Sequence, residues 1–200
     1  MSNQIWFGTL IKEVDLNVNV NPLIDFIYNL KKDLPNNEIG SSIDAWQSPD
    51  LSDNVVFNDL KENIFNHADD MFELFNINKN KQLVISNMWA GINPRGGSNT
   101  LHNHPGATFS GVFYLKVPEK SGDIVFTHPA VNHNYHFNVH TVSLWNNINS
   151  GAKNITPKVG KLLLFPSYQY HYVKPNQSNE DRISIAFNLS LIGINTYTNT

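Results

Sequence analysis

The chain of 200 residues contains no cysteine, only two arginines and 16% charged residues. Without cysteine it can form neither disulfides nor thiolate metal sites, so histidine and carboxylate remain as metal donors. These donors favour hard or borderline metals such as iron, manganese or zinc. The net charge of −3 and the absence of any Lys/Arg run argue against nucleic acid as the main partner, since phosphate binding needs clustered cations.

Long apolar stretches are also missing. No segment approaches the roughly 18 apolar residues of a membrane span, and the first residues show no signal-peptide pattern. We therefore expect a cytoplasmic protein without membrane contact, in the host cytoplasm if a phage encodes it. An apolar content of 40% is enough for one good core, so we expect a single domain over 1–200.

Two helices are predicted in residues 1–80, which we expect to support the rest of the domain together with N-terminal strands. Asn21-Pro22 is typical of an N-cap followed by proline in the first turn, which predicts a helix over about 22–33. A second helix, ending near Asn76, is predicted by an apolar stripe at steps of three and four: Phe57, Leu60, Ile64, Ala68, Met71 and Phe75. His67 lies beside this stripe, which indicates core packing and not a functional role.

From Lys81 onward the pattern changes to short apolar or alternating runs separated by turn residues, which predicts strands. The expected strands are 83–92, 109–117, 124–126, 135–142, 161–165, 170–174 and 183–191. The fold class is therefore mainly β with N-terminal helices, and the β core is a double-stranded β-helix (a jelly roll, or cupin-like barrel) over 81–195.

Three histidines form the strongest candidate site. His102 and His104 are two residues apart, so both project from one face if the segment is extended. His171 follows 67 residues after His104. Three imidazoles with room for small molecules between them are typical of an open catalytic metal site. His133, His136 and His140 do not share a strand face, and we expect them to line the substrate site or to be exposed.

Three segments surround these histidines with further motifs. They are His102-Asn103-His104-Pro105-Gly106 leading to Ser110-Gly111-Val112-Phe113-Tyr114-Leu115, Gly160 to His171, and Arg182-Ile183-Ser184-Ile185-Ala186-Phe187-Asn188. Over about residues 85–190 this pattern resembles the 2-oxoglutarate- and Fe(II)-dependent oxygenase superfamily, in particular a bacterial and phage subgroup with HxHPG, SGVxYL, FPSxxxH and RISIxFN motifs.

The resemblance implies that His102, His104 and His171 are catalytic metal ligands. Most members of the superfamily carry a carboxylate two residues after the first histidine, where this chain has His104. Either three imidazoles bind the metal or an acid such as Asp123 completes the shell. We favour three histidines, because no spacing ties Asp123 to the metal.

Five further side chains are candidates for binding the cosubstrate. Arg182 and Ser184 share a strand face, and a guanidinium offers a planar fork that matches a carboxylate. This Arg-x-Ser resembles the superfamily's anchor for 2-oxoglutarate. Tyr114 faces the metal if the strand parity of His104 continues, although such a tyrosine is equally typical of core. Asn87 is a weaker candidate, as is Asn188, and both can instead be buried amides.

The resemblance implies Fe(II), 2-oxoglutarate and O2 as cofactors and cosubstrates, with succinate and CO2 released and a substrate C–H bond hydroxylated. The substrate is an unidentified small molecule or protein side chain, and a homodimer is the default expectation. Two alternatives stay open. One is a metal enzyme on a cupin-like barrel that uses no oxo acid, and the other is a non-catalytic jelly-roll binding module.

Overall fold

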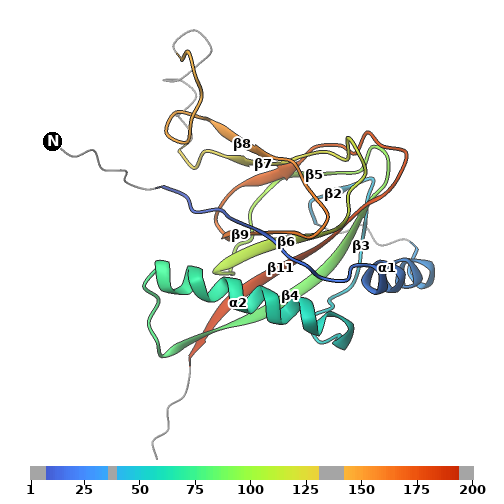
Figure 1. Ribbon diagram of the computed structural model, residues 1–200, viewed down its shortest axis with the longest axis horizontal. Helices are drawn as coiled ribbons and strands as arrows, with labels where there is room; N and C mark the ends of the chain where they lie inside the picture. The colour runs from blue at the N-terminus through green and yellow to red at the C-terminus, as the bar shows by residue number, and fades with distance from the viewer. Residues whose placement is uncertain (1–7, 36–39, 131–141, 194–200) are drawn as a thin grey trace, which may run out of the picture.

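The computed structural model describes residues 8–35, 40–130 and 142–193 (Figure 1). Their elements are, in chain order, β1 (Lys12–Asp15), α1 (Asn21–Asp33), β2 (Ser42–Ile43), β3 (Trp46–Gln47), η1 (Val55–Phe57), α2 (Asn58–Leu74), β4 (Lys81–Asn93), β5 (Ser98–His102), β6 (Phe109–Lys116), β7 (Ile124–Thr127), β8 (Ala152–Ile155), β9 (Lys161–Pro166), β10 (His171–Val173) and β11 (Arg182–Gly193).

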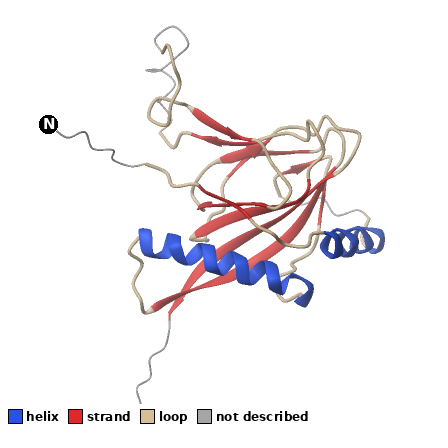
Figure 2. Cartoon of the chain, in the orientation of Figure 1, coloured by secondary structure: helices blue, strands red, loops and turns tan. Residues whose placement is uncertain are grey.

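These strands form two antiparallel sheets that face each other. The six-stranded sheet has the order β1-β9-β6-β11-β4-β3, and the five-stranded sheet has the order β2-β5-β10-β7-β8. Both helices lie on the side of the larger sheet that is turned away from the smaller one (Figures 1 and 2). This is the double-stranded β-helix with N-terminal helices that the sequence predicts.

Two apolar layers result from the alternation of strand side chains. Odd positions of β11, such as Ile185 and Phe187, point to the helices and pack with Leu60, Ile64 and Met71 of α2. Between the two sheets, a second cluster is formed by Tyr114, Ile124, Phe126, Ile155, Leu163 and Phe165. The predicted stripe of the second helix is thus buried against the larger sheet, and each fully buried aliphatic or aromatic side chain contributes about 1.5–3 kcal/mol.

Helix boundaries differ slightly from the prediction. Asn21 is the first helical residue and not the N-cap; the N-cap is Val20, and the Asn19 Oδ1 accepts a hydrogen bond from the Asn21 N–H at 3.3 Å. Phe75 does not end the buried stripe, because α2 stops at Leu74 and the chain turns away at Asn76, whose φ is +48°. As a result Phe75 is 43% exposed, although its ring centroid lies 5.3 Å from that of the buried Phe109.

The sequence pattern missed the polar strands β5 and β8, because neither carries a run of apolar residues. The predicted strand over 135–142 lies, except for its last residue, outside the described residues, as do His133, His136 and His140. Of the helices in the described part of the chain, none is long and apolar enough to cross a membrane.

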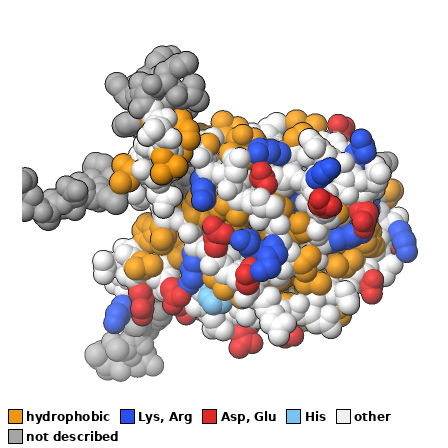
Figure 3. Space-filling model, turned by 45° about the horizontal axis from the view of Figure 1, so that its top comes forward, with side chains coloured by type: hydrophobic (Ala, Val, Ile, Leu, Met, Phe, Trp, Pro, Cys, Tyr) orange, Lys and Arg blue, Asp and Glu red, His pale blue; other side chains and the backbone are white. Residues whose placement is uncertain are grey.

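Opposite charges are interspersed on the surface. On the face drawn in Figure 3, Lys and Arg side chains alternate with Asp and Glu side chains. Lys161 pairs with Glu13 at 2.9 Å, and Lys158 pairs with Asp15 at 2.8 Å. This face therefore offers no continuous basic patch of the kind that phosphate binding requires.

Candidate metal centre

The smaller sheet brings the three predicted histidines together. His102 is the last residue of β5 and His171 is the first residue of β10, and the two are direct partners in the antiparallel register. His104 lies beyond the end of β5, so the expectation that both early histidines project from one strand is correct only for His102. The His104 backbone N–H donates to the Ser167 carbonyl at 2.9 Å, which holds this loop against the turn between β9 and β10.

The ring nitrogens of His102, His104 and His171 lie within 4.8 Å of one another, a spacing at which one ion can contact all three. The His102 Nδ1 lies 2.7 Å from the Thr100 carbonyl and the His171 Nδ1 lies 3.0 Å from the Gln169 carbonyl. A carbonyl can only accept, so each Nδ1 carries the proton and each Nε2 keeps a free lone pair. Backbone carbonyls thus fix both rings in the tautomer that a metal needs.

Burial keeps the three imidazoles uncharged. The pKa of His104 is lowered to about 4 and that of His171 to about 3, mainly by desolvation and in smaller part by the neighbouring His102. The pKa of His102 is lowered by burial as well, against the opposing hydrogen bond to Thr100. Neutral imidazole is the form that ligates metals.

No carboxylate joins this group within the described residues. Asp123, the alternative acid ligand, is occupied elsewhere: its carboxylate accepts hydrogen bonds from the Lys174 Nζ and the Thr156 Oγ1, both at 3.0 Å. The Lys174 hydrogen bond lowers the pKa of Asp123 despite partial burial. The donor set in the described residues is therefore three neutral imidazoles, which suits iron, zinc and similar borderline metals.

A cavity of about 470 Å³ extends from the three histidines between the two sheets, and Arg182, Ser184 and Tyr114 line it. Arg182 and Ser184 thus share the cavity face of β11, while Ile183 and Ile185 belong to the core, as their alternation predicts. Val112 and Phe165 add apolar surface to the cavity wall.

Arg182 is an unusual group for this position because its side chain is buried, with 2% exposed, and none of the ion pairs in the described part of the chain involves it. One guanidinium nitrogen donates to the Ser121 and Gly122 carbonyls at 3.2 and 3.3 Å, and the Nε has no partner. Desolvation lowers the pKa of Arg182. A buried cation without a counter-charge is costly, and an anion bound in the cavity would offset that cost.

The other predicted cosubstrate residues fall into two groups. Tyr114 is buried beside the cavity, and burial raises its pKa to about 12, so its hydroxyl stays a hydrogen-bond donor. Asn87, by contrast, does not line the cavity: it lies further along β4, where it pairs with Asn188. The Asn188 Oδ1 accepts a hydrogen bond from the Ser110 Oγ at 2.7 Å, in keeping with the buried-amide interpretation.

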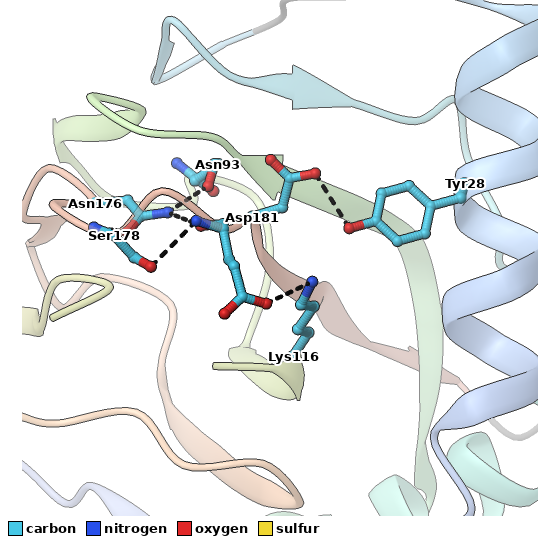
Figure 4. Close-up of polar contacts among 7 residues, drawn as sticks. Tyr28, Asn93, Lys116, Asn176, Ser178 and Asp181 are labelled. Atoms are coloured by element: carbon cyan, nitrogen blue, oxygen red, sulfur yellow. Dashed lines mark hydrogen bonds and ion pairs between the residues drawn. The ribbon is translucent and has the colours of Figure 1, made fainter. Parts of the chain in front are cut away.

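A polar network holds the segment that precedes Arg182 (Figure 4). The Asn176 Nδ2 donates to the Asn93 and Glu180 carbonyls at 2.9 and 2.8 Å, and its backbone bonds to Gly96 and Gly97. Asn176 therefore fastens the turn that leads to β5 onto the loop between β10 and β11.

Next to Arg182, the same close-up shows two contacts to other elements. The Tyr28 hydroxyl of α1 donates to the Asp181 carboxylate at 3.1 Å, and Lys116 of β6 pairs with Glu180 at 3.2 Å (Figure 4). These contacts fix the start of β11, where Arg182 enters the cavity.

Several cavity residues were not predicted from the sequence, chiefly Ser41, Trp89, Asn93 and Asn99. Ser41 comes from the N-terminal segment, and no spacing rule connects it to the histidines. Asn93 stands before the turn Pro94-Arg95-Gly96-Gly97, which is a signal for a strand end but not for a site. His67, as expected, lies on α2 and outside this cavity.

Solved structures with the same fold include two prolyl hydroxylases and HygX. A prolyl-4-hydroxylase from Pseudomonas putida is 12% identical with a TM-score of 0.62, covering 89% of this chain and 91% of that one. HygX from Streptomyces hygroscopicus, with nickel, 2-oxoglutarate and hygromycin B bound, is 14% identical with a TM-score of 0.60, covering 96% and 85%. The collagen prolyl hydroxylase of Paramecium Bursaria Chlorella virus-1, in complex with 2-oxoglutarate, is 14% identical with a TM-score of 0.57, covering 90% and 94%.

At these identities the likeness shows a common fold. A search of curated proteins finds no significant sequence match. The sequence itself matches the model of a family described as "Putative 2OG-Fe(II) oxygenase" over residues 87–188, just over half of the chain. Fe(II) and 2-oxoglutarate are the metal and cosubstrate of that family, and three grouped imidazoles suit the ion. The chain belongs to the 2-oxoglutarate- and Fe(II)-dependent oxygenases.

Proposed function

We propose that this oxygenase is a hydroxylase, and that His102, His104 and His171 hold its iron while Arg182, Ser184 and Tyr114 hold 2-oxoglutarate. One observation carries the proposal: a single cavity has three neutral imidazoles at one end and a buried, unpaired guanidinium lining it. A metal and a dianion supply the two partners that these groups lack. Hydroxylation is favoured as the reaction type because two of the structures that share the fold are prolyl hydroxylases.

His102 and His171 would present Nε2 to the ion, because the Nδ1 of each is engaged by a backbone carbonyl. When bound, Fe(II) supplies the redox chemistry that couples oxidation of 2-oxoglutarate by O2 to oxidation of a substrate C–H bond. Three uncharged ligands leave the full positive charge of the ion uncompensated by the protein. The cavity would therefore attract an anionic chelator such as a 2-oxo acid more strongly than a site with a carboxylate ligand would.

Arg182 would bind the distal carboxylate. Its guanidinium is already oriented by the Ser121 and Gly122 carbonyls, and its Nε is free to donate. Tyr114 adds a hydroxyl that remains protonated at any physiological pH, since its pKa is about 12. Buried donors aimed at a carboxylate from several directions fix both its position and its ionised state. Val112 and Phe165 line the same cavity and would limit the access of water to the bound cosubstrate.

The decisive test is anaerobic addition of Fe(II) and 2-oxoglutarate to metal-free protein, followed by the weak visible charge-transfer band of the complex. We expect the band in the wild type and in Lys79→Ala, which removes an exposed cation outside the cavity. It should be absent in His171→Ala and strongly weakened in Arg182→Ala. Bound metal without a band would indicate a metal enzyme that uses no oxo acid, and a protein that retains no metal would indicate a binding module; either result would refute the proposal.

A further inference from the structure

A row of uncharged polar side chains forms one wall of the cavity. This polar wall consists of Asn93, Asn99, Ser41 and Ser42, which come from the end of β4, from β5 and from the start of β2. The Asn93 Nδ2 lies 3.4 Å from the Asn99 Oδ1, and the Asn99 Nδ2 lies 3.3 Å from the Ser41 Oγ and 3.4 Å from the Ser42 Oγ. The wall therefore connects two strands and the N-terminal segment.

These contacts are long for hydrogen bonds, whose usual N–H···O distance is about 2.7–3.2 Å. Donors and acceptors in the wall are therefore only weakly satisfied by one another, although they lie in a partly enclosed space. A bound molecule can take over these hydrogen bonds at little cost, since the exchange breaks only weak ones.

The polar wall ends at the metal centre. The Ser41 Oγ lies 3.4 Å from the Nε2 of His102, the nitrogen that we assign to the ion. Trp89 also lines the cavity, with its ring centroid 6.0 Å from that of His104, and adds an aromatic surface beside the centre. A molecule held by the wall would thus place its nearest carbon atoms close to the site of oxidation.

The side chains of the polar wall favour an uncharged ligand over a charged one. Carboxamides and hydroxyls both donate and accept hydrogen bonds, so they match groups that do the same, whereas a carboxylate only accepts and an ammonium only donates. Because the three histidines are neutral, Arg182 is the only charged side chain among the described residues that line the cavity. An additional charge brought in by a substrate would be desolvated there without a partner.

We propose that the polar wall binds an uncharged substrate and presents a hydroxyl or carboxamide group of it next to the carbon that is oxidised. This inference rests on the proposed function, because that function assigns both Arg182 and the charge of the ion to 2-oxoglutarate. No further cationic side chain among the described lining residues is then left for an anionic substrate. Hydroxyl and carboxamide share the same donor–acceptor chemistry, and a sugar or a peptide backbone can supply it.

Binding can be measured without turnover in protein loaded with Zn(II) and 2-oxoglutarate, by ligand-observed NMR. One set of probes is methyl α-D-glucopyranoside, D-glucosamine and D-glucuronate, and the other is N-acetylglycinamide, glycinamide and N-acetylglycine. In at least one set the neutral member should bind about tenfold more tightly than both charged members, which corresponds to about 1.4 kcal/mol. The responding set identifies the source of the group. Equal or tighter binding of a charged member, or no binding of either neutral probe, would overturn the proposal.

Two matched variants assign the effect to the wall. Asn99→Leu removes the polar atoms of Asn99 at nearly constant size and should weaken binding of the neutral probe about fivefold, the value of one hydrogen bond. Asn154→Leu makes the same change on β8, outside the cavity, and should leave binding unchanged.

The cosubstrate is tested separately by titrating the Fe(II) protein with 2-oxoglutarate and following the charge-transfer band. If Asn99→Leu weakens 2-oxoglutarate binding as much as it weakens probe binding, the wall serves the cosubstrate and the substrate proposal is wrong. If the wild type itself gives no band, the proposed function fails instead, so the two failures are distinguishable.

Discussion

The two sheets of the barrel differ in length, in covering and in chemistry. β4 and β11 of the larger sheet have 13 and 12 residues and pair along their whole length, and their outer face is covered by α1 and α2 (Figure 1). β5 and β10 of the smaller sheet have five and three residues. The outer face of the smaller sheet exposes apolar side chains, among them Leu101 and Tyr170. Yet this short sheet carries His102 and His171.

This division separates stability from reactivity. The larger sheet buries its apolar face between helices and cavity and supplies a rigid frame, to which Arg182 and Tyr114 are attached. The smaller sheet buries fewer apolar side chains, so its ordered structure can depend on bound ligands. Regions with few buried contacts open more easily than core strands, and ligand sites are often built from them.

The largest expected effect is on the larger sheet. Phe187→Ala removes a fully buried ring and should reduce the free energy of unfolding by about 3–5 kcal/mol, because it leaves a cavity in the core. Leu101→Ala on the smaller sheet, whose side chain is 56% exposed, should change it by less than about 1 kcal/mol. Urea denaturation of both variants measures the two changes in the free energy of unfolding. Changes of similar size would contradict the proposed difference in stability between the two sheets.

Metal binding should stabilise the protein chiefly through the smaller sheet. Zn(II) at about 100 times its dissociation constant should stabilise the protein by about 2.7 kcal/mol, since only the folded state groups the three histidines. Hydrogen exchange followed by mass spectrometry should locate the added protection in β5 and β10, with little change in β4 and β11. Uniform protection, or the same gain in His171→Ala, would show that the smaller sheet is not the element that the ion orders.

Arg182→Ala should weaken 2-oxoglutarate binding by about 10- to 150-fold, the range expected when hydrogen bonds worth about 1.5–3 kcal/mol to a charged group are lost. Metal content should not change, because Arg182 belongs to the larger sheet and the histidines do not. The measurement is a 2-oxoglutarate titration together with metal analysis, with Lys79→Ala, an exposed cation outside the cavity, as the control. Loss of metal in Arg182→Ala would mean that the two ends of the cavity are not independent.

The smallest predicted effect concerns the connection between the sheets. Asn176→Ala removes hydrogen bonds to the Asn93 and Glu180 carbonyls and should weaken 2-oxoglutarate binding about fivefold, corresponding to roughly 1 kcal/mol, by loosening the segment before Arg182. Gln177→Ala alters the exposed neighbouring side chain and should have no effect. If Asn176→Ala lowers stability but leaves the cosubstrate affinity unchanged, the network serves the fold alone.

Periodicity in the sequence was sufficient for α2 and for β4, β6, β9 and β11 of the larger sheet, because long buried elements carry a long apolar pattern. It did not locate the short strands β1 and β3. It failed for β5, a polar strand whose partners are provided by residues far along the chain. Spacing related Arg182 to Ser184, and the structure finds both on one cavity face. Asn87 fits the same strand parity as Trp89 and yet lies outside the cavity, since parity fixes the face of a strand but not the position along it. Ser41 could not be predicted, because only the pairing of β2 with β5 brings it to the histidines. Asn99 lies three residues before His102, so strict alternation would place it on the other face, but the pairing of β5 with β10 is irregular between these two residues.

The direct pairing of His102 with His171 has one more consequence. On the proposed ligand set, an ion bound to both would join two strands that are about 70 residues apart in the chain, as a disulfide would in a secreted domain. Closing a loop of this length lowers the conformational entropy of the unfolded chain, which stabilises the folded state by about 3–5 kcal/mol. In a protein without cysteine, this cross-link would be reversible and would depend on the supply of iron. Scarcity of iron would therefore destabilise the folded protein and shorten its lifetime, in addition to abolishing its activity.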